Sequence, residues 1–231
     1  MEFSYIKNNL EALQEELLRI AGSVGVQPPK LVSVTKSGSD EELMALFRAG
    51  ASAMGENRPQ ELKRRAELLS AASLFPELHE IGKLQSNKVK LIAQRVTLIH
   101  SLDSLSLAKE IDRQAKKYGR RIPVLIEINS ANEPQKSGVS PSEAAAFYES
   151  LSEFDSIEVK GLMTMGPANC TKEELRGYFR LTRCLFDSMA DEYGFGSDAT
   201  LSMGMSDSYD IAIEEGTTLV RVGRRLFSKT N

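Results

Sequence analysis

Lys36 is the residue of this sequence whose position first suggests chemistry. It follows Leu31–Thr35, a segment rich in β-branched residues that predicts a buried strand. A lysine at the carboxyl end of a parallel strand lies where α/β proteins keep their active sites. When its ammonium group is removed from water, it can lose a proton and attack a carbonyl, which gives a Schiff base. A solvated lysine at a strand end is the simpler interpretation, so this hypothesis needs support from other residues.

Two loops near the end of the chain carry groups that bind anions. The segment Leu201–Asp207 supplies two hydroxyls and a glycine ahead of an expected helix, and Val220–Arg224 supplies a guanidinium group and another glycine. Glycine allows backbone N–H groups to approach a ligand closely, and a helix N-terminus favours negative charge. Each loop alone is a weak signal, because serine-rich turns and surface arginines are common. The two loops indicate a binding site only if the fold brings them together with Lys36.

An alternation of strands and helices is expected to position these residues. Strand patterns occur at about 31–35, 51–54, 78–81, 96–99, 123–128, 157–165, 200–203 and 218–222. Helix patterns occur at about 2–21, 40–49, 59–69, 86–94, 103–118, 141–151, 171–193 and 207–215. This alternation predicts one domain over residues 1–231, a (β/α)8 TIM barrel, with the N-terminal helix packing where an eighth outer helix is missing. An open doubly wound sheet is the alternative, and the lack of a glycine-rich first turn disfavours it.

Closure of the barrel would bring the two loops to Lys36. The eighth strand would then lie beside the first, with the seventh strand next to it. The loops after strands seven and eight are the usual phosphate site of such barrels. A lysine nucleophile beside an anion site fits a ligand with both an aldehyde and a phosphate, and pyridoxal 5′-phosphate (PLP) is the common one.

Composition narrows the classes of function. A net charge of -3 over 231 residues gives no sign of nucleic-acid or anionic-membrane binding. No apolar run approaches the ~20 residues that span a membrane, and the acidic N-terminal segment is unlike a signal peptide. The two cysteines make neither a disulfide framework nor a metal site. We therefore expect a cytoplasmic protein without a metal.

Five motifs surround the candidate residues in order along the chain. They are Lys36 after Leu-Val-Ser-Val-Thr, Gly55–Asn57, His79–Lys88, Leu201–Ser206 and Val220–Gly223. Together they resemble the pyridoxal phosphate homeostasis protein family, also known as the proline synthase co-transcribed proteins. The resemblance covers about Leu31 to Phe227.

The resemblance implies a fold similar to the N-terminal barrel of alanine racemase, with PLP held as a Schiff base on Lys36. It implies that phosphate is bound by Ser202 and by the backbone around Met203, Gly204, Gly223 and Arg224. Arg221 would lie near the pyridine nitrogen or the phosphate, and Asn57 near the polar edge of the cofactor. His79 and Met163 are further candidates, for which a structural hydrogen bond and packing at the barrel mouth are the alternatives.

One position departs from the family pattern. The family commonly has Gly-Thr or Gly-Ser after the arginine of strand eight, whereas this chain has Gly223-Arg224-Arg225. A hydroxyl contact to phosphate is then lost. Arg224 either replaces it with a charged donor or points to solvent.

Three functions follow for comparison. The resemblance implies a non-catalytic PLP-binding protein, expected as a monomer, that serves vitamin B6 and amino-acid homeostasis, with PLP, other B6 vitamers or amino acids as partners. A PLP-dependent racemase or decarboxylase is the alternative, but racemases of this fold use a tyrosine from a second domain and this chain ends after strand eight. A Schiff-base lyase acting on phosphorylated substrates is the third, and it would need an acid–base residue that the sequence does not reveal.

Overall fold

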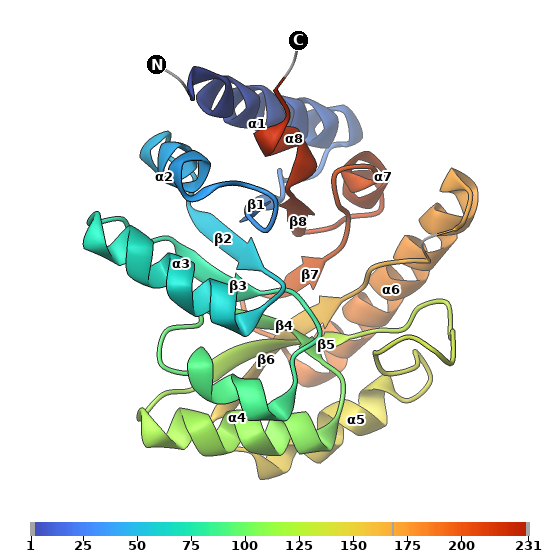
Figure 1. The fold of residues 1–231 in the computed structure, drawn as a ribbon. Helices are drawn as coiled ribbons and strands as arrows, with labels where there is room; N and C mark the ends of the chain where they lie inside the picture. The colour runs from blue at the N-terminus through green and yellow to red at the C-terminus, as the bar shows by residue number, and fades with distance from the viewer. Residues whose placement is uncertain (1–2, 168, 230–231) are drawn as a thin grey trace.

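Eight parallel strands close into a barrel in which each strand pairs with its neighbours in the chain (Figure 1). The computed structural model describes residues 3–167 and 169–229. The strands are β1 Lys30–Val34, β2 Ala53–Glu56, β3 Glu77–Glu80, β4 Leu98–Leu102, β5 Ile122–Glu127, β6 Ile157–Met163, β7 Thr200–Ser202 and β8 Leu219–Val222. Because β1 pairs with both β2 and β8, the (β/α)8 barrel is confirmed and the open sheet is wrong.

Helices cover the outside of the barrel. They are α1 Ser4–Val24, α2 Asp40–Arg48, α3 Pro59–Ala71, α4 Leu105–Lys117, α5 Ala144–Ser150, α6 Lys172–Tyr193, α7 Tyr209–Glu214 and α8 Arg224–Phe227, with 3-10 turns η1 Ser86–Leu91 and η2 Leu151–Glu153. The helix expected at 86–94 is only the short turn η1, and α8 was not expected because four residues are too few to show a period. The predicted helix start at Glu2 lies outside the described residues. Among the described helices, none has the length and apolar character needed to cross a bilayer.

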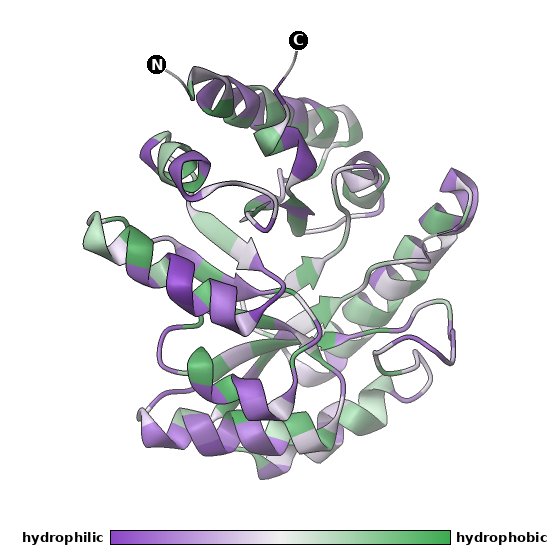
Figure 2. Cartoon of the chain, in the orientation of Figure 1, coloured by the Kyte–Doolittle hydropathy of each residue, from purple (hydrophilic) through white to green (hydrophobic). Residues whose placement is uncertain are grey.

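The helix α1 occupies the place that the sequence left open for the eighth helix. Its buried residues Ile6, Leu10, Leu13 and Leu17 recur at helical spacing, and α1 packs against α2, α7 and α8. Burial of each such side chain contributes about 1.5–3 kcal/mol. Figure 1 shows α1 beside α8, and Figure 2 shows the mixed hydrophobic and hydrophilic residues expected of a covering helix. The N-terminal helix thus completes the outer ring.

The barrel interior is partly apolar and partly polar. An apolar layer is formed by Val32, Ala53, Leu98, Leu125, Met163 and Leu219. Side chains two positions apart on a strand share a face. The period therefore places His100 above Leu98 and Arg221 above Leu219, both buried. Polar side chains thus fill the interior between this layer and the carboxyl ends of the strands.

Candidate cofactor site

A cavity lies at the carboxyl ends of β1, β2 and β8, where the sequence predicts chemistry. Its volume of about 380 Å³ falls in the range of about 300–1,000 Å³ typical of small-molecule sites. Five of the residues expected to bind a cofactor line it together: Lys36, Asn57, Arg221, Gly223 and Arg224. The loop after β7 contributes Met205–Ser208 to the same lining. The closed barrel therefore brings the first strand and both loops to one place.

The backbone that carries Lys36 is held firmly, although the Lys36 side chain is exposed. Arg65 of α3 donates to the backbone carbonyls of Thr35 and, at 2.8 Å, of Gly38. The Thr35 hydroxyl donates to Glu56, which also pairs with Arg65 at 3.0 Å. Burial raises the pKa of Glu56, and the contacts with Thr35 and Arg65 oppose that rise. The Lys36 side chain thus extends into solvent from a backbone that is fixed by hydrogen bonds.

Two glycines shape the loops around the cavity. A Cβ atom on Gly223 would lie 2.7 Å from the carbonyl oxygen of Val34, so only glycine allows β8 and β1 to approach so closely here. Gly204 has a φ of 88°, and its Cβ would lie 2.6 Å from that of Ala212. Gly204 does not line the cavity, so its place in the structure is that of a turn residue between β7 and α7.

Hydroxyl and backbone donors meet on one side of the cavity. The backbone N–H of Gly223 donates to Ser206 Oγ at 3.4 Å, and both residues line the cavity. Ser206 is not among the binding residues expected from the sequence, although it ends the Leu201–Ser206 motif, which is a signal that could identify it. Arg224 pairs with Asp207, and both side chains are exposed. The charge of Arg224 is therefore already partnered beside the Gly223 N–H and the Ser206 hydroxyl.

Arg221 is held by hydrogen bonds to the carboxyl ends of β7 and β6. It donates to the Ser202 carbonyl oxygen at 3.1 Å, to the Ser202 hydroxyl, and to the Thr164 carbonyl oxygen at 3.2 Å. Burial lowers the pKa of Arg221 to about 10, so the group remains cationic at neutral pH. Ser202 itself is fully buried and does not line the cavity. The hydroxyls in the lining come instead from Ser206 and Ser208 in the loop that follows it, and from Ser37 in the loop after β1.

The remaining candidates lie inside the barrel. Met163 packs in the interior apolar layer, and Met203 is buried in the main core. His79 contacts His100 through its Nδ1 atom at 2.9 Å, and neither histidine lines the cavity. Within the described residues, no group of three or more His, Cys, Asp or Glu side chains could hold a metal ion. The alternatives of packing for Met163 and of a hydrogen bond for His79 therefore agree with these positions.

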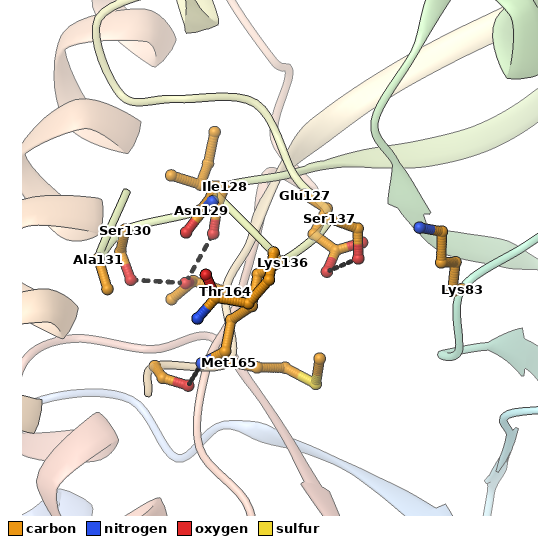
Figure 3. Close-up of a pocket in the computed structure, with 12 residues that line it drawn as sticks. Lys83, Glu127, Ile128, Asn129, Ser130, Ala131, Lys136, Ser137, Thr164 and Met165 are labelled. Atoms are coloured by element: carbon orange, nitrogen blue, oxygen red, sulfur yellow. Dashed lines mark hydrogen bonds between the residues drawn. The ribbon is translucent and has the colours of Figure 1, made fainter. Parts of the chain in front are cut away.

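A second cavity of about 280 Å³ adjoins the first at the ends of β5 and β6 (Figure 3). Met165 lines both cavities. Glu127 is buried in its wall and accepts a hydrogen bond from Ser137 at 3.4 Å. Burial raises the pKa of the Glu127 carboxyl. Figure 3 shows Lys83 on the facing side with its amine directed towards this pair, while Lys136 lines the cavity from the loop after β5.

Known proteins share both the sequence and the fold. The chain matches the family model of the alanine racemase N-terminal domain over residues 8–230. It is 40% identical over 220 residues to the pyridoxal phosphate homeostasis protein of Aquifex aeolicus, covering 95% of this chain and 94% of that protein.

Solved structures extend the comparison. PipY of Synechococcus elongatus, solved with PLP bound, superposes with a TM-score of 0.83 at 29% identity, covering 96% of this chain and all of PipY (100%). Alanine racemase of Corynebacterium glutamicum superposes with a TM-score of 0.74 at 19% identity, where the match covers 98% of this chain and 61% of that protein, and shows the shared fold. The chain therefore belongs to the alanine racemase N-terminal domain family and, within it, to the pyridoxal phosphate homeostasis proteins.

Proposed function

We propose that this protein binds PLP in the cavity at the ends of β1 and β8, as a Schiff base on Lys36, and that it serves PLP homeostasis without turnover. The observation that carries the proposal is that the exposed Lys36, the backbone of Gly223 and the hydroxyl-bearing loop after β7 line one cavity. PipY, the relative solved with PLP bound, supports the identity of the ligand. The relatives are named homeostasis proteins, which supports the absence of turnover.

The residues of the cavity divide the ligand between them. The Lys36 amine would condense with the aldehyde, because it is the one lysine among the described residues of this lining. Ser206 and the Gly223 N–H would receive the phosphate, and Arg221 would face the ring nitrogen from below. Asn57 would meet the polar edge of the ring. We propose that Ser202, Met203 and Gly204 affect PLP binding indirectly, because they fix the course of the loop after β7 that lines the cavity.

The electrostatics of the cavity support binding without carbanion chemistry. Bound PLP supplies an electron sink, and its strength depends on protonation of the ring nitrogen. A cationic Arg221 at that nitrogen would disfavour its protonation. Among the described residues that line the cavity, Asp207 is the only carboxylate, it is paired with Arg224, and there is no histidine, cysteine or tyrosine. A racemase or decarboxylase would need a free base at this place.

The test is chemical. The purified protein loaded with PLP should absorb visible light, and borohydride followed by peptide mass spectrometry should locate the cofactor on Lys36. Incubation with amino acids in deuterium oxide should give no faster Cα exchange than free PLP. Labelling of another lysine would contradict the site, and stereospecific exchange that disappears in Lys36→Ala would show that the protein is an enzyme.

We further propose that the second cavity receives the amino-acid partner. A buried carboxyl at Glu127 suits an ammonium group, and the Lys83 amine across the cavity suits a carboxylate. In Lys36→Ala protein without PLP, equilibrium dialysis should detect an amino acid but not its N-acetylated form, and Glu127→Gln should weaken that binding. Equal binding of both forms would contradict this assignment. Binding of other B6 vitamers, a monomeric state and a place in the cytoplasm stay predictions from the sequence.

A further inference from the structure

A chain of hydrogen bonds runs through the barrel interior to the floor of the cofactor cavity. It starts at Glu77 at the beginning of β3, whose Oε2 lies 3.2 Å from His79 Nε2. His79 Nδ1 lies 2.9 Å from His100 Nε2, and His100 Nδ1 lies 3.1 Å from Ser202 Oγ. Ser202 Oγ then receives the hydrogen bond of Arg221. The two histidines, the serine and the arginine are all buried, with exposed fractions of 3% or less.

The Glu77 end of the chain fixes the direction of every hydrogen bond when both imidazoles are neutral. A carboxylate only accepts, so His79 carries its proton on Nε2 and donates to Glu77. His79 Nδ1 is then an acceptor, so His100 carries its proton on Nε2 and donates to His79. His100 Nδ1 in turn accepts from the Ser202 hydroxyl, whose oxygen accepts from Arg221, because a guanidinium group only donates. With two neutral rings, this is the order that satisfies each group.

The surroundings agree with that order. Burial lowers the pKa of both His79 and His100, which favours their neutral forms. The hydrogen bond from His79 holds the pKa of Glu77 down to about 2, so this end is a carboxylate. Lys30 pairs with Glu77 on the outer side, and Glu127 acts on Arg221 from β5. The positive charge of Lys30 further lowers the pKa of His79, and that of Arg221 lowers the pKa of His100.

We propose that Ser202, His100 and His79 are positioning residues that aim Arg221 at the cofactor from the floor of the cavity. Hydrogen bonds that all point one way polarise one another. A residue that donates to its neighbour therefore becomes a stronger acceptor for the residue on its other side, and Ser202 Oγ becomes a stronger acceptor for Arg221. Since Arg221 keeps its proton, the hydrogen-bonded chain orients the guanidinium group and does not transfer protons. The role of Arg221 towards the ring rests on the proposed function, whereas the order of protons in the chain does not.

The first test uses the protein without PLP and reads the histidines alone. The sequence holds two histidines, so nitrogen-15 NMR of labelled protein resolves both rings. We expect both to be neutral at pH 7, each with a protonated Nε2 and an unprotonated Nδ1. A proton on Nδ1 of either ring, or a charged ring at pH 7, would overturn the proposed chain whatever the protein binds.

The second test compares the same substitution at two buried serines, Ser202 and Ser101. Ser202→Ala removes a link, whereas Ser101→Ala on β4 removes a buried hydroxyl that has no hydrogen-bond partner in the described part of the chain. Only Ser202→Ala should shift the His100 nitrogen signals, weaken PLP binding by about tenfold and change the pH profile of the visible spectrum. Ser202→Thr, which restores the hydroxyl, should recover most of the loss. Equal effects of both alanine variants would reduce Ser202 to packing and overturn the proposal.

Discussion

The rim of the cofactor cavity and the barrel interior below it treat polar side chains in opposite ways. At the rim, Lys36 and Asn57 are exposed and no hydrogen bond from either side chain is found within the described residues. In the interior, Arg221 is 3% exposed and donates to three oxygen atoms. The group that would react is therefore exposed on a fixed backbone, and the charged group that would set the ring electronics is held in one place.

This difference has a physical reason. A lysine that must form and release a covalent bond needs freedom to rotate, and its chemistry does not depend on one resting position. An arginine that acts on a ring nitrogen does so through its place and direction, so it gains from contacts that are made before the ligand arrives. The carboxyl ends of the strands provide both kinds of environment within one cavity.

The largest effect is expected from removal of the exposed lysine, Lys36. Lys36→Ala should abolish borohydride-stable attachment of PLP, because no other described lysine lines the cavity. Non-covalent binding should persist at lower affinity, since the phosphate and ring contacts remain. Lys90→Ala, which removes an exposed lysine from η1, is the matched control and should keep full attachment. Retained attachment in Lys36→Ala, read by mass spectrometry, would contradict the assignment.

The next largest effect is expected from removal of the buried arginine, Arg221. Arg221→Ala should weaken PLP binding by about tenfold to a hundredfold, as expected for loss of a charge-assisted contact. It should also lower the free energy of unfolding by about 1–3 kcal/mol, because the Ser202 and Thr164 oxygen atoms lose a buried donor. Titration of the visible spectrum and urea unfolding measure the two effects. Unchanged affinity together with lost stability would place Arg221 outside the binding site.

The same contrast explains which features the sequence revealed. Lys36 and the eight strands depend on local patterns, so both could be predicted. The expected second strand stopped at Met54, but β2 continues through Glu56, because that carboxyl is buried against Arg65 nine residues later. The contacts of Ser202 join residues 19 and 102 positions away. Its place in the interior therefore depends on barrel closure and register, which no local motif shows.

Glu80 sharpens the comparison as a buried carboxyl that is held at one oxygen atom only. Its Oε1 atom accepts from the Gly82 N–H at 3.3 Å, whereas its Oε2 atom has no hydrogen-bond partner within the described residues. Burial raises the pKa of Glu80 from 4.5 to about 8. The native state therefore binds a proton that the unfolded state releases above pH 4.5, so stability falls as the pH rises from about 4.5 to 8. Glu80→Gln should raise the free energy of unfolding by about 1–3 kcal/mol at pH 8 and change it little at pH 4.

Urea unfolding of Glu80→Gln at several pH values checks this slope. Glu56→Gln is the contrasting variant, because Glu56 is equally buried but pairs with Arg65 and accepts from Thr35. It should destabilise the protein at neutral pH, since it leaves a buried arginine without its partner. Parallel pH profiles for wild type and Glu80→Gln would show that the Glu80 carboxyl titrates normally.

The smallest expected effect concerns Arg224, the position that departs from the family pattern. Arg224 stands where a hydroxyl is common, yet it pairs with Asp207 and is exposed. Exposed ion pairs contribute about 0–1 kcal/mol, so Arg224→Ala should change PLP affinity by less than about fivefold. Arg224→Thr restores the usual hydroxyl and should bind PLP at least as tightly as the wild type. If Arg224→Ala lowered PLP affinity as much as Arg221→Ala, Arg224 would have to leave Asp207 and bind the phosphate. The rim of the cavity would then also contain a charged side chain with a fixed position.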